Sequence, residues 1–382
     1  MNGIRKQTGL VLCVDIPIFE TMKRLVSIDA LRGFDMMFIM GMAGIITAMC
    51  GLFPGGGDSW LSVQMSHVAW DGLRHHDTIF PLFLFISGMT FPFSYANRRE
   101  RGVSNGRIFW VTLRRGMVLV ALGLVYNYFF RLQLSTLRIP SVLARIGLAW
   151  MFAAWLFIWC GWKARAIIVA VILVGYGLIL TIEAPDAAGA GALTLEGNIV
   201  GYVDRLLMPN HLLKKGVFDP EGILSTIPAI ATAMLGQFTG EFVKDSKCRR
   251  KTLWMLAAAV LLLGAGLLWS LWQPVNKKLW TSSFVLVVGA YSVAMFALFY
   301  YIIDVRGWKK WTPFFTVIGM NSITIYMAQR IVPFKQVSEF FLGGLAGLMS
   351  PPWAKLVLAI GYFAVSWLFL WFLHRHKVYL KV

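Results

Sequence analysis

Four side chains that could carry chemistry lie close together in the segment HVAWDGLRHHDTIFPLFLFISG. His67, Trp70, Asp71 and Asp77 stand just before, or at the start of, its long apolar run. An imidazole takes and returns protons near neutral pH or accepts an acyl group, and nearby carboxylates can orient it or its substrate. We therefore predict that His67, Asp71 and Asp77 are catalytic. A histidine beside a membrane interface is also often structural, so the compartment that it faces has to be established.

The composition is that of a protein that crosses a membrane many times. Of 382 residues, 58% are hydrophobic and only 14% are charged, whereas soluble domains average about a quarter charged residues. A bilayer core admits only helices or closed barrels, and long apolar runs predict helices. We expect an all-α bundle. The four cysteines are scattered without the spacing of a metal site, and we expect no metal.

Apolar runs of roughly twenty residues, each long enough to cross a bilayer as a helix, occur about ten times. Residues 340–349 are expected to form an interfacial or re-entrant piece. The predicted domains are a cytoplasmic N-terminal extension, residues 1–25, and one transmembrane domain, residues 26–382. The expected spans lie at about 29–53, 77–97, 109–129, 140–160, 166–183, 222–243, 252–272, 279–303, 312–330 and 353–373.

The connections between these runs alternate in charge. Short basic connections, such as KDSKCRRK, alternate with longer ones at 54–76, 130–139, 184–221, 273–278 and 331–352. The basic set holds about twice as many Lys and Arg residues, which predicts that it is cytoplasmic, together with both termini. His67 then lies on the far side. The net charge of +18 reflects these loops, and we expect no nucleic-acid partner.

Further polar residues are predicted on or near the far side. Carboxylates, amides and a tryptophan facing one compartment are typical of an amino-sugar site. Alternatives remain for some of them: Asp219 could begin a helix, Arg138 could be an interfacial anchor, and Asn321 could join helices. The predicted substrate-binding residues are Trp70, Arg138, Asp219, Glu221, Asn276, Lys277 and Asn321.

Four arginines stand near or within the predicted spans: Arg32, Arg114, Arg115 and Arg145. Ions inside a membrane are costly and are often functional, and guanidinium groups match phosphate oxygens. A group of arginines opening to the cytoplasm therefore suits an anionic ligand that carries phosphates. Structural ion pairs, such as Asp29 with Arg32 at a spacing of i, i+3, explain the same residues equally well.

Seven motifs occur in order, and together they resemble the heparan-alpha-glucosaminide N-acetyltransferase family from about residue 24 onward. This resemblance implies transfer of acetyl from cytosolic acetyl-CoA to the amino group of a terminal glucosamine across the membrane. It makes His67 the match to the active-site histidine, and the four arginines become candidates for the CoA phosphates. The motifs are SIDALRGFDM, HVAWDGLRHHDTIFPLFLFISG, RIPSVLARIG, GYVDRLL, FDPEGILSTI, PVNKKLW and GMNSI.

The chain departs from the lysosomal member in one respect. That enzyme has an asparagine upstream of its histidine, whereas the stretch GMAGIITAMCGLFPGGG has none. Asn276, Asn321 or a backbone amide would then stabilise a developing oxyanion. An acetyl-histidine intermediate and direct transfer both stay open.

The expected protein is a multi-pass acyltransferase of a bacterial inner membrane, acting on periplasmic glucosamine or a glucosamine-ended saccharide. A homodimer is compatible with the sequence. The alternative function is an amino-sugar transporter, which the lack of paired broken helices disfavours.

Overall fold

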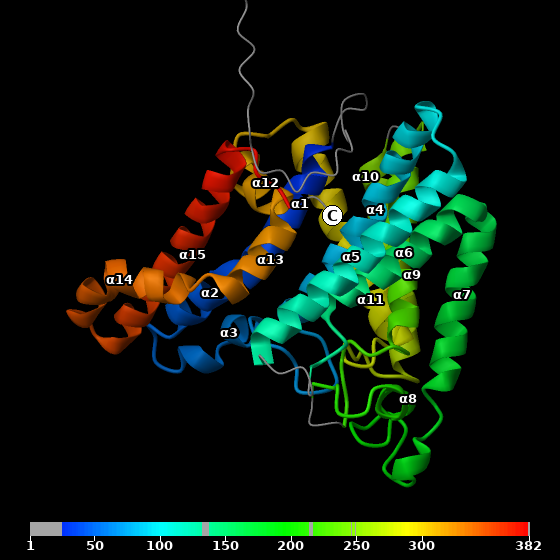
Figure 1. Ribbon diagram of the computed structural model, residues 1–382, viewed down its shortest axis with the longest axis horizontal. Helices are drawn as coiled ribbons and strands as arrows, with labels where there is room; N and C mark the ends of the chain where they lie inside the picture. Colours follow the sequence, from blue (N-terminus) through cyan, green and yellow to red (C-terminus); the bar gives the residue numbers. More distant parts are fainter. Residues whose placement is uncertain (1–24, 132–136, 214–216, 246, 249, 381–382) are drawn as a thin grey trace, which may run out of the picture.

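The computed structural model describes residues 25–131, 137–213, 217–245, 247–248 and 250–380, and this part of the chain is mostly helical (Figure 1). The predicted extension at residues 1–25 lies outside the described residues, apart from its last residue. The helices are α1 (Val26–Met37), η1 (Phe38–Met42), α2 (Ala43–Cys50), η2 (Gly56–Asp58), α3 (Trp60–Gln64), α4 (His75–Glu100), α5 (Asn105–Arg131), α6 (Val142–Trp159), α7 (Trp162–Ile179), η3 (Pro185–Ala187), α8 (Ile199–Leu207), α9 (Thr226–Asp245), α10 (Lys251–Ser270), α11 (Ser282–Tyr300), η4 (Tyr301–Val305), α12 (Thr312–Met320), α13 (Ser322–Ile331), α14 (Phe334–Gly347) and α15 (Pro351–Arg375).

Within the described residues, eight helical segments are long and apolar enough to cross a membrane, which confirms a polytopic helical protein. The other two expected spans are also helical, but one carries polar side chains and the other is broken into two helices. Helix α9 carries Gln237 and Thr239 and packs inside the bundle, where polar side chains avoid lipid. The span expected at 312–330 breaks at Asn321 into two short helices, α12 and α13.

The connections separate onto two ends of the bundle, as Figure 1 shows. Helix α1 begins and α15 ends at one end, where the connections α4–α5, α6–α7 and α9–α10 also lie. The longer connections between α2 and α4, and between α7 and α9, lie at the opposite end. The basic and polar connections are therefore segregated as their charges predict. Which end is cytoplasmic stays a prediction.

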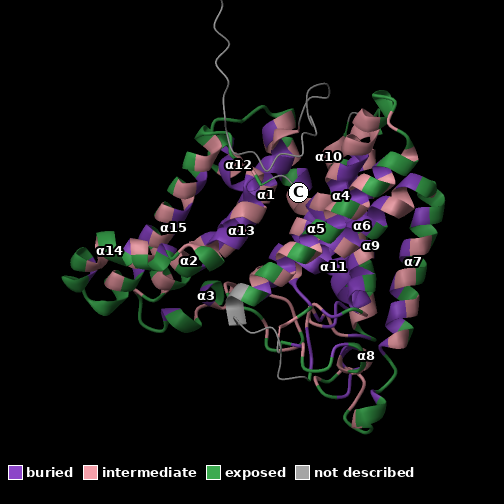
Figure 2. Cartoon of the chain, viewed as in Figure 1, coloured by how far each residue is buried: buried purple, intermediate pink, exposed green. Residues whose placement is uncertain are grey.

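The core lies where α4 and α9 touch backbone to backbone. A Cβ atom on Gly88 would lie 2.0 Å from the Ala233 carbonyl oxygen, and one on Gly236 would lie 2.1 Å from that of Phe85. Only glycine permits so close an approach. Around this pair, α6 and α11 are also largely buried, whereas α7 and α10 face outward (Figure 2).

A second close contact joins α1 to α12. A Cβ on Gly33 would lie 1.8 Å from the carbonyl oxygen of Phe315, and one on Gly319 would lie 2.2 Å from that of Asp29. Beyond this contact, the first span contains the π-helical turn η1, where Gly41 has a φ of 137°. Non-glycine residues rarely adopt this conformation, so Gly41 allows the span to bend.

The predicted interfacial piece is helix α14, which packs beside the start of α15. It exposes Phe340 and Phe341.

Candidate active site

His67 and Asp77 form a contact that closes the loop between α3 and α4. His67 Nδ1 lies 2.7 Å from Asp77 Oδ1. The Asp77 side chain is only 1% exposed, whereas that of His67 is 54% exposed. Because an ionised carboxylate can only accept, the contact places a proton on Nδ1, and in the neutral imidazole Nε2 then carries the lone pair. The arrangement therefore offers an oriented imidazole with a free basic nitrogen.

The first turn of α4 holds Asp77 in place. The backbone N–H groups of Val68 and Arg74 donate to Asp77 Oδ2 at 3.2 and 3.3 Å. A helix N-terminus favours a negative group at this position. The Arg74 guanidinium donates to Ser66 Oγ at 2.7 Å and to the carbonyl of His67 at 3.0 Å. Both the backbone and the side chain of His67 are thus fixed by residues around the helix start.

Lys277 brings the connection between α10 and α11 to this pair. Its Nζ lies 3.3 Å from His67 Nδ1 and 3.3 Å from Asp77 Oδ1. Burial lowers the pKa of the Lys277 ammonium, and the nearby Asp77 carboxylate opposes that shift. Three predicted residues, from two distant parts of the chain, therefore meet here.

Asp71 and Asn276 meet beside this group. The amide nitrogen of Asn276 donates to Asp71 Oδ1 at 3.0 Å, and its Oδ1 accepts from Leu279 N at 2.9 Å. Asn276 is fully buried. Its contacts indicate that it fixes the loop carrying Lys277, and Asp71 contacts Asn276 rather than His67.

Trp70 ties the same loop to the long connection that precedes α8. Its indole N–H donates to the carbonyl of Leu193 at 2.7 Å, and its ring lies 5.5 Å from that of Phe218. The Lys278 ammonium stands 5.5 Å from the indole centroid. Trp70, which was predicted to bind the substrate, is therefore anchored between its own loop and the connection that precedes α8.

Arg138, Asp219 and Glu221 form a second charged group. Arg138 binds Asp219 through two bonds, Nε to Oδ2 at 2.7 Å and Nη2 to Oδ1 at 2.6 Å, and also donates to Glu221. Burial disfavours the positive charge of the Arg138 guanidinium. The hydrogen bonds with Asp219 and the negative charge of Glu221 outweigh this effect and raise the pKa of Arg138. The helix-start interpretation of Asp219 is wrong, because α9 begins only at Thr226.

Asp204, on α8, is a buried carboxyl that the sequence predictions did not include. Its Oδ1 accepts from Ile223 N at 2.9 Å, and its Oδ2 has no partner among the described residues. Burial raises the pKa of Asp204 to about 7. A usable signal existed, since Asp204 follows Val200 by four residues and shares its buried face of α8.

The predicted group of four arginines is divided between the two ends of the bundle. Arg32 and Arg98 act electrostatically on Arg115, whose guanidinium stands 4.4 Å from the Trp150 centroid. The neighbouring Arg114 is exposed.

Arg145 lies apart from the other three. It is at the start of α6 and donates to the carbonyl of Gly222 at 3.2 Å and to Ser225. We expected Arg145 to open to the cytoplasm together with the other three arginines. This expectation is wrong, because α6 starts at the end that carries the polar connections.

Asn321 is buried at the joint between α12 and α13. Its amide donates to the carbonyl of Val317 at 3.2 Å, and none of its described contacts involves His67. Gly319, two residues earlier, packs on Asp29 and Gly33. The structure therefore does not bring Asn321 to the predicted substrate site.

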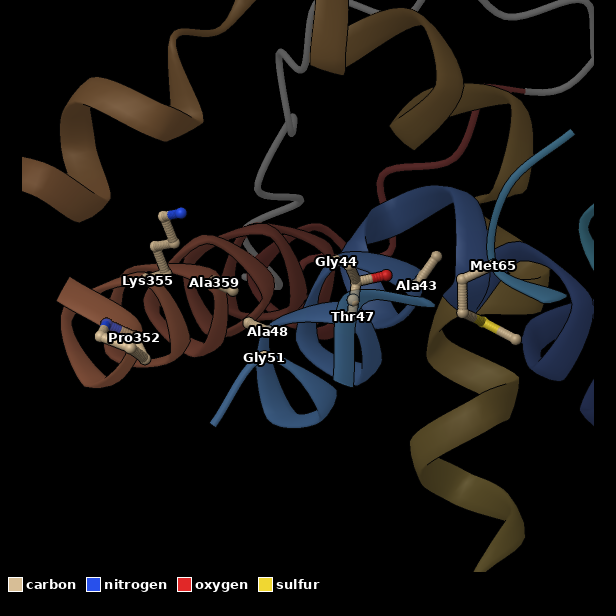
Figure 3. A pocket seen from close by; sticks show the side chains of 10 residues that line it. Ala43, Gly44, Thr47, Ala48, Gly51, Met65, Pro352, Lys355 and Ala359 are labelled. Carbon is tan, nitrogen blue, oxygen red and sulfur yellow. The ribbon is translucent and has the colours of Figure 1, made fainter. Parts of the chain in front are cut away.

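A separate pocket of about 560 Å³ lies between α2 and α15 (Figure 3). It is lined mainly by small and apolar residues, with Thr47 and Lys355 as its polar groups, and it contains none of the predicted site residues. In the part of the chain that the structure covers, no group of three or more His, Cys, Asp or Glu side chains is placed to hold a metal ion.

Comparison with known proteins gives two curated relatives. Human heparan-alpha-glucosaminide N-acetyltransferase is 28% identical over 364 residues, covering 81% of this chain and 53% of the human protein. The mouse protein of the same name is 28% identical over 334 residues, covering 73% of this chain and 50% of its own length. The chain thus spans about half the length of the curated relatives it matches. No family model matches it.

Proposed function

We propose, because the chain belongs to the heparan-alpha-glucosaminide N-acetyltransferase family, that it transfers acetyl from acetyl-CoA to an amino sugar across a membrane. The acceptor is glucosamine or a saccharide that ends in glucosamine. The membrane is the inner membrane of a bacterium, with acetyl-CoA on the cytoplasmic side and the acceptor in the periplasm.

The observation that carries this proposal is the His67–Asp77 pair. Asp77 holds the Nδ1 proton, so His67 Nε2 is free to act at the surface of the site. In one route, Nε2 attacks the thioester carbonyl, the C–S bond breaks and the amine then attacks the acetyl-imidazole. In the other, Nε2 takes the proton of the attacking amine and passes it to the departing thiolate. Both routes end in the same amide and thiol.

The donor reaches the pair from the opposite end of the bundle. Acetyl-CoA is too large and too charged to cross a membrane, but its pantetheine arm is slim enough to thread between helices. Arg32 and Arg115, together with Arg98, form the cationic group best placed for its phosphates. Holding the thioester beside His67 supplies the proximity that speeds aminolysis.

The acceptor binds among the charged groups of the polar end. Glu221 is a carboxylate near Lys277 and Arg138, and it is partly exposed beside the fully buried Asp219. Such a carboxylate suits an ammonium or a sugar hydroxyl. Trp70 and Asp71 line the neighbouring loop. We assign the sugar to this region, with its amine toward His67.

The test uses the purified protein in lipid vesicles, with labelled acetyl-CoA and unlabelled glucosamine. Formation of labelled N-acetylglucosamine supports the proposal. In vesicles of defined orientation, product should form when the donor faces the basic end and the acceptor faces the polar end. Uptake of glucosamine without any consumption of acetyl-CoA would show a transporter instead.

A further inference from the structure

Asp204 and Arg145 hold the two sides of one peptide group. Asp204 Oδ1 accepts from the N–H of Ile223 at 2.9 Å. Arg145 donates to the carbonyl of Gly222 at 3.2 Å, and the Thr226 hydroxyl donates to the same oxygen at 2.9 Å. These two backbone atoms belong to the same peptide unit, and in a trans peptide they point in opposite directions. The Gly222–Ile223 peptide plane is therefore clamped between an acidic and a basic side chain.

Both clamping side chains keep unused hydrogen-bonding capacity. Asp204 Oδ2 and Arg145 Nε and Nη1 are buried and have no partner within the described parts of the chain. A Cβ on Gly222 would lie 1.7 Å from Asp204 Oδ2, so a larger residue would displace the carboxyl. Unpaired buried charges are costly, and opposite charges on either side of one peptide stabilise each other.

The clamped peptide directly follows the residues that form the second charged group. Glu221 immediately precedes Gly222, and Glu221 and Asp219 both bind Arg138. We propose that Asp204 is a positioning residue which, through the Gly222–Ile223 peptide, sets the placement of Glu221 for the amine-bearing acceptor. This inference rests on the proposed function, in which Glu221 lies at the acceptor site.

The placement of Glu221 then depends on whether Asp204 is protonated. Asp219 from the turn and Tyr176 from α7 face Asp204 together with the cations Arg145 from α6 and Arg205 from α8. When Asp204 is ionised, it attracts Arg145 across the peptide and tightens the clamp. When it is protonated, Arg145 loses that counter-charge. Since burial raises the pKa of Asp204 to about 7, the clamp tightens as pH rises through neutrality.

The test compares the wild type with Asp204→Asn, because the amide oxygen can still accept from Ile223. Asp58→Asn is the matched control, since Asp58 is an exposed carboxylate of η2 and does not contact Asp204, Arg145 or Arg205. The first readout is the backbone ¹⁵N–¹H signal of Ile223 in lipid nanodiscs, in protein labelled with ¹⁵N only at isoleucine, where the signal is identified by its loss in Ile223→Val. We expect this signal to titrate with a midpoint near 7 in the wild type and control, and to be flat in Asp204→Asn.

The second readout is the KM for glucosamine. The acceptor amine titrates equally in all proteins, so the ratio of KM in Asp204→Asn to KM in the wild type isolates Asp204. This KM ratio should be near one at acidic pH and should rise to about tenfold above pH 7, the effect of losing one buried charged contact. The effect on kcat should be smaller.

The outcomes separate the two proposals. A flat Ile223 signal in the wild type, or a KM ratio that does not change with pH, overturns the role of Asp204 while acetyl transfer stands. A titrating Ile223 signal without acetyl transfer in any protein overturns the proposed function but supports the clamp.

Discussion

The 2.7 Å contact between His67 Nδ1 and Asp77 Oδ1 joins an exposed imidazole to a buried carboxylate. The carboxylate belongs to the first turn of α4, whereas the imidazole belongs to the loop before it. A loop residue thereby takes its orientation from a packed helix, and sites supported in this way are held more precisely than sites on free loops.

Removal of the imidazole should abolish catalysis while leaving the donor site intact. In His67→Ala we expect transfer to glucosamine to fall by about 10²–10⁴-fold, the contribution typical of an acid–base side chain. Acetyl-CoA binding, measured by calorimetry in detergent, should be unchanged. His376→Ala, an exposed histidine after α15, serves as the control. A folded His67→Ala protein with a normal rate would refute the assignment.

Replacing the Asp77 carboxylate should slow catalysis by changing the tautomer of the His67 imidazole. Asp77→Asn keeps the size of the side chain but no longer requires a proton on Nδ1, so kcat should fall by about 10²–10⁴-fold. Asp71→Asn is the matched control, because Asp71 contacts Asn276 rather than His67, and its loss should be much smaller. Equal losses in steady-state rates of the two variants would contradict this view of the pair.

The arginines at the basic end should affect donor affinity. Arg115→Gln should raise the KM for acetyl-CoA by about tenfold, as expected for one charged hydrogen bond to phosphate, with less effect on kcat. The preceding residue, Arg114, offers a comparison on the same helix, since Arg114 is exposed whereas Arg115 lies near Arg32 and Arg98. If Arg114→Gln raised the KM and Arg115→Gln did not, the phosphates would lie elsewhere.

Asp204 should make the protein less stable as pH rises. Its pKa is raised from the ordinary 3.8 to about 7, so the folded state binds the proton more tightly. The stability that the neutral carboxyl contributes is complete below about pH 4 and is lost as pH rises through about 7. The melting temperature of the wild type should therefore fall relative to Asp204→Asn over this interval. A constant difference between the two would argue against a raised pKa.

The contact between α1 and α12 should tolerate no side chain. In Gly33→Ala the new Cβ would meet the carbonyl oxygen of Phe315, which is part of the backbone and cannot turn away. We expect a loss of about 1–3 kcal/mol in stability, measured by denaturant unfolding. Gly264→Ala on α10 should be harmless, because nothing lies within 4 Å of its added Cβ.

The local pattern of the sequence predicted the helices and the start of α4, because apolar runs and an acid in a first turn are properties of neighbouring residues. It could name Asp77 and Lys277 separately but could not pair them, since they are 200 residues apart. The same holds for Arg138 and Asp219, which are 81 residues apart.

For two further residues, the sequence held a signal that the predictions did not use. Arg145 was grouped with the other three arginines by its residue type, although the predicted span at 140–160 follows the polar connection at 130–139 and so places Arg145 near the polar end. The spacing of Asp204 from Val200 could have indicated that Asp204 is buried, but only the packed structure shows that its carboxyl accepts from the N–H of Ile223.

The glycine contacts described above make the molecule mechanically uneven. Helices α4 and α9 touch through their backbones, and so do α1 and α12, so neither pair can slide without losing contact along its length. Between the pairs, α1 and α4 meet through side chains such as Leu31 and Phe85, which can change rotamer. The bundle therefore contains two helix pairs held backbone to backbone, and we expect the side-chain contact between α1 and α4 to yield more readily than either pair.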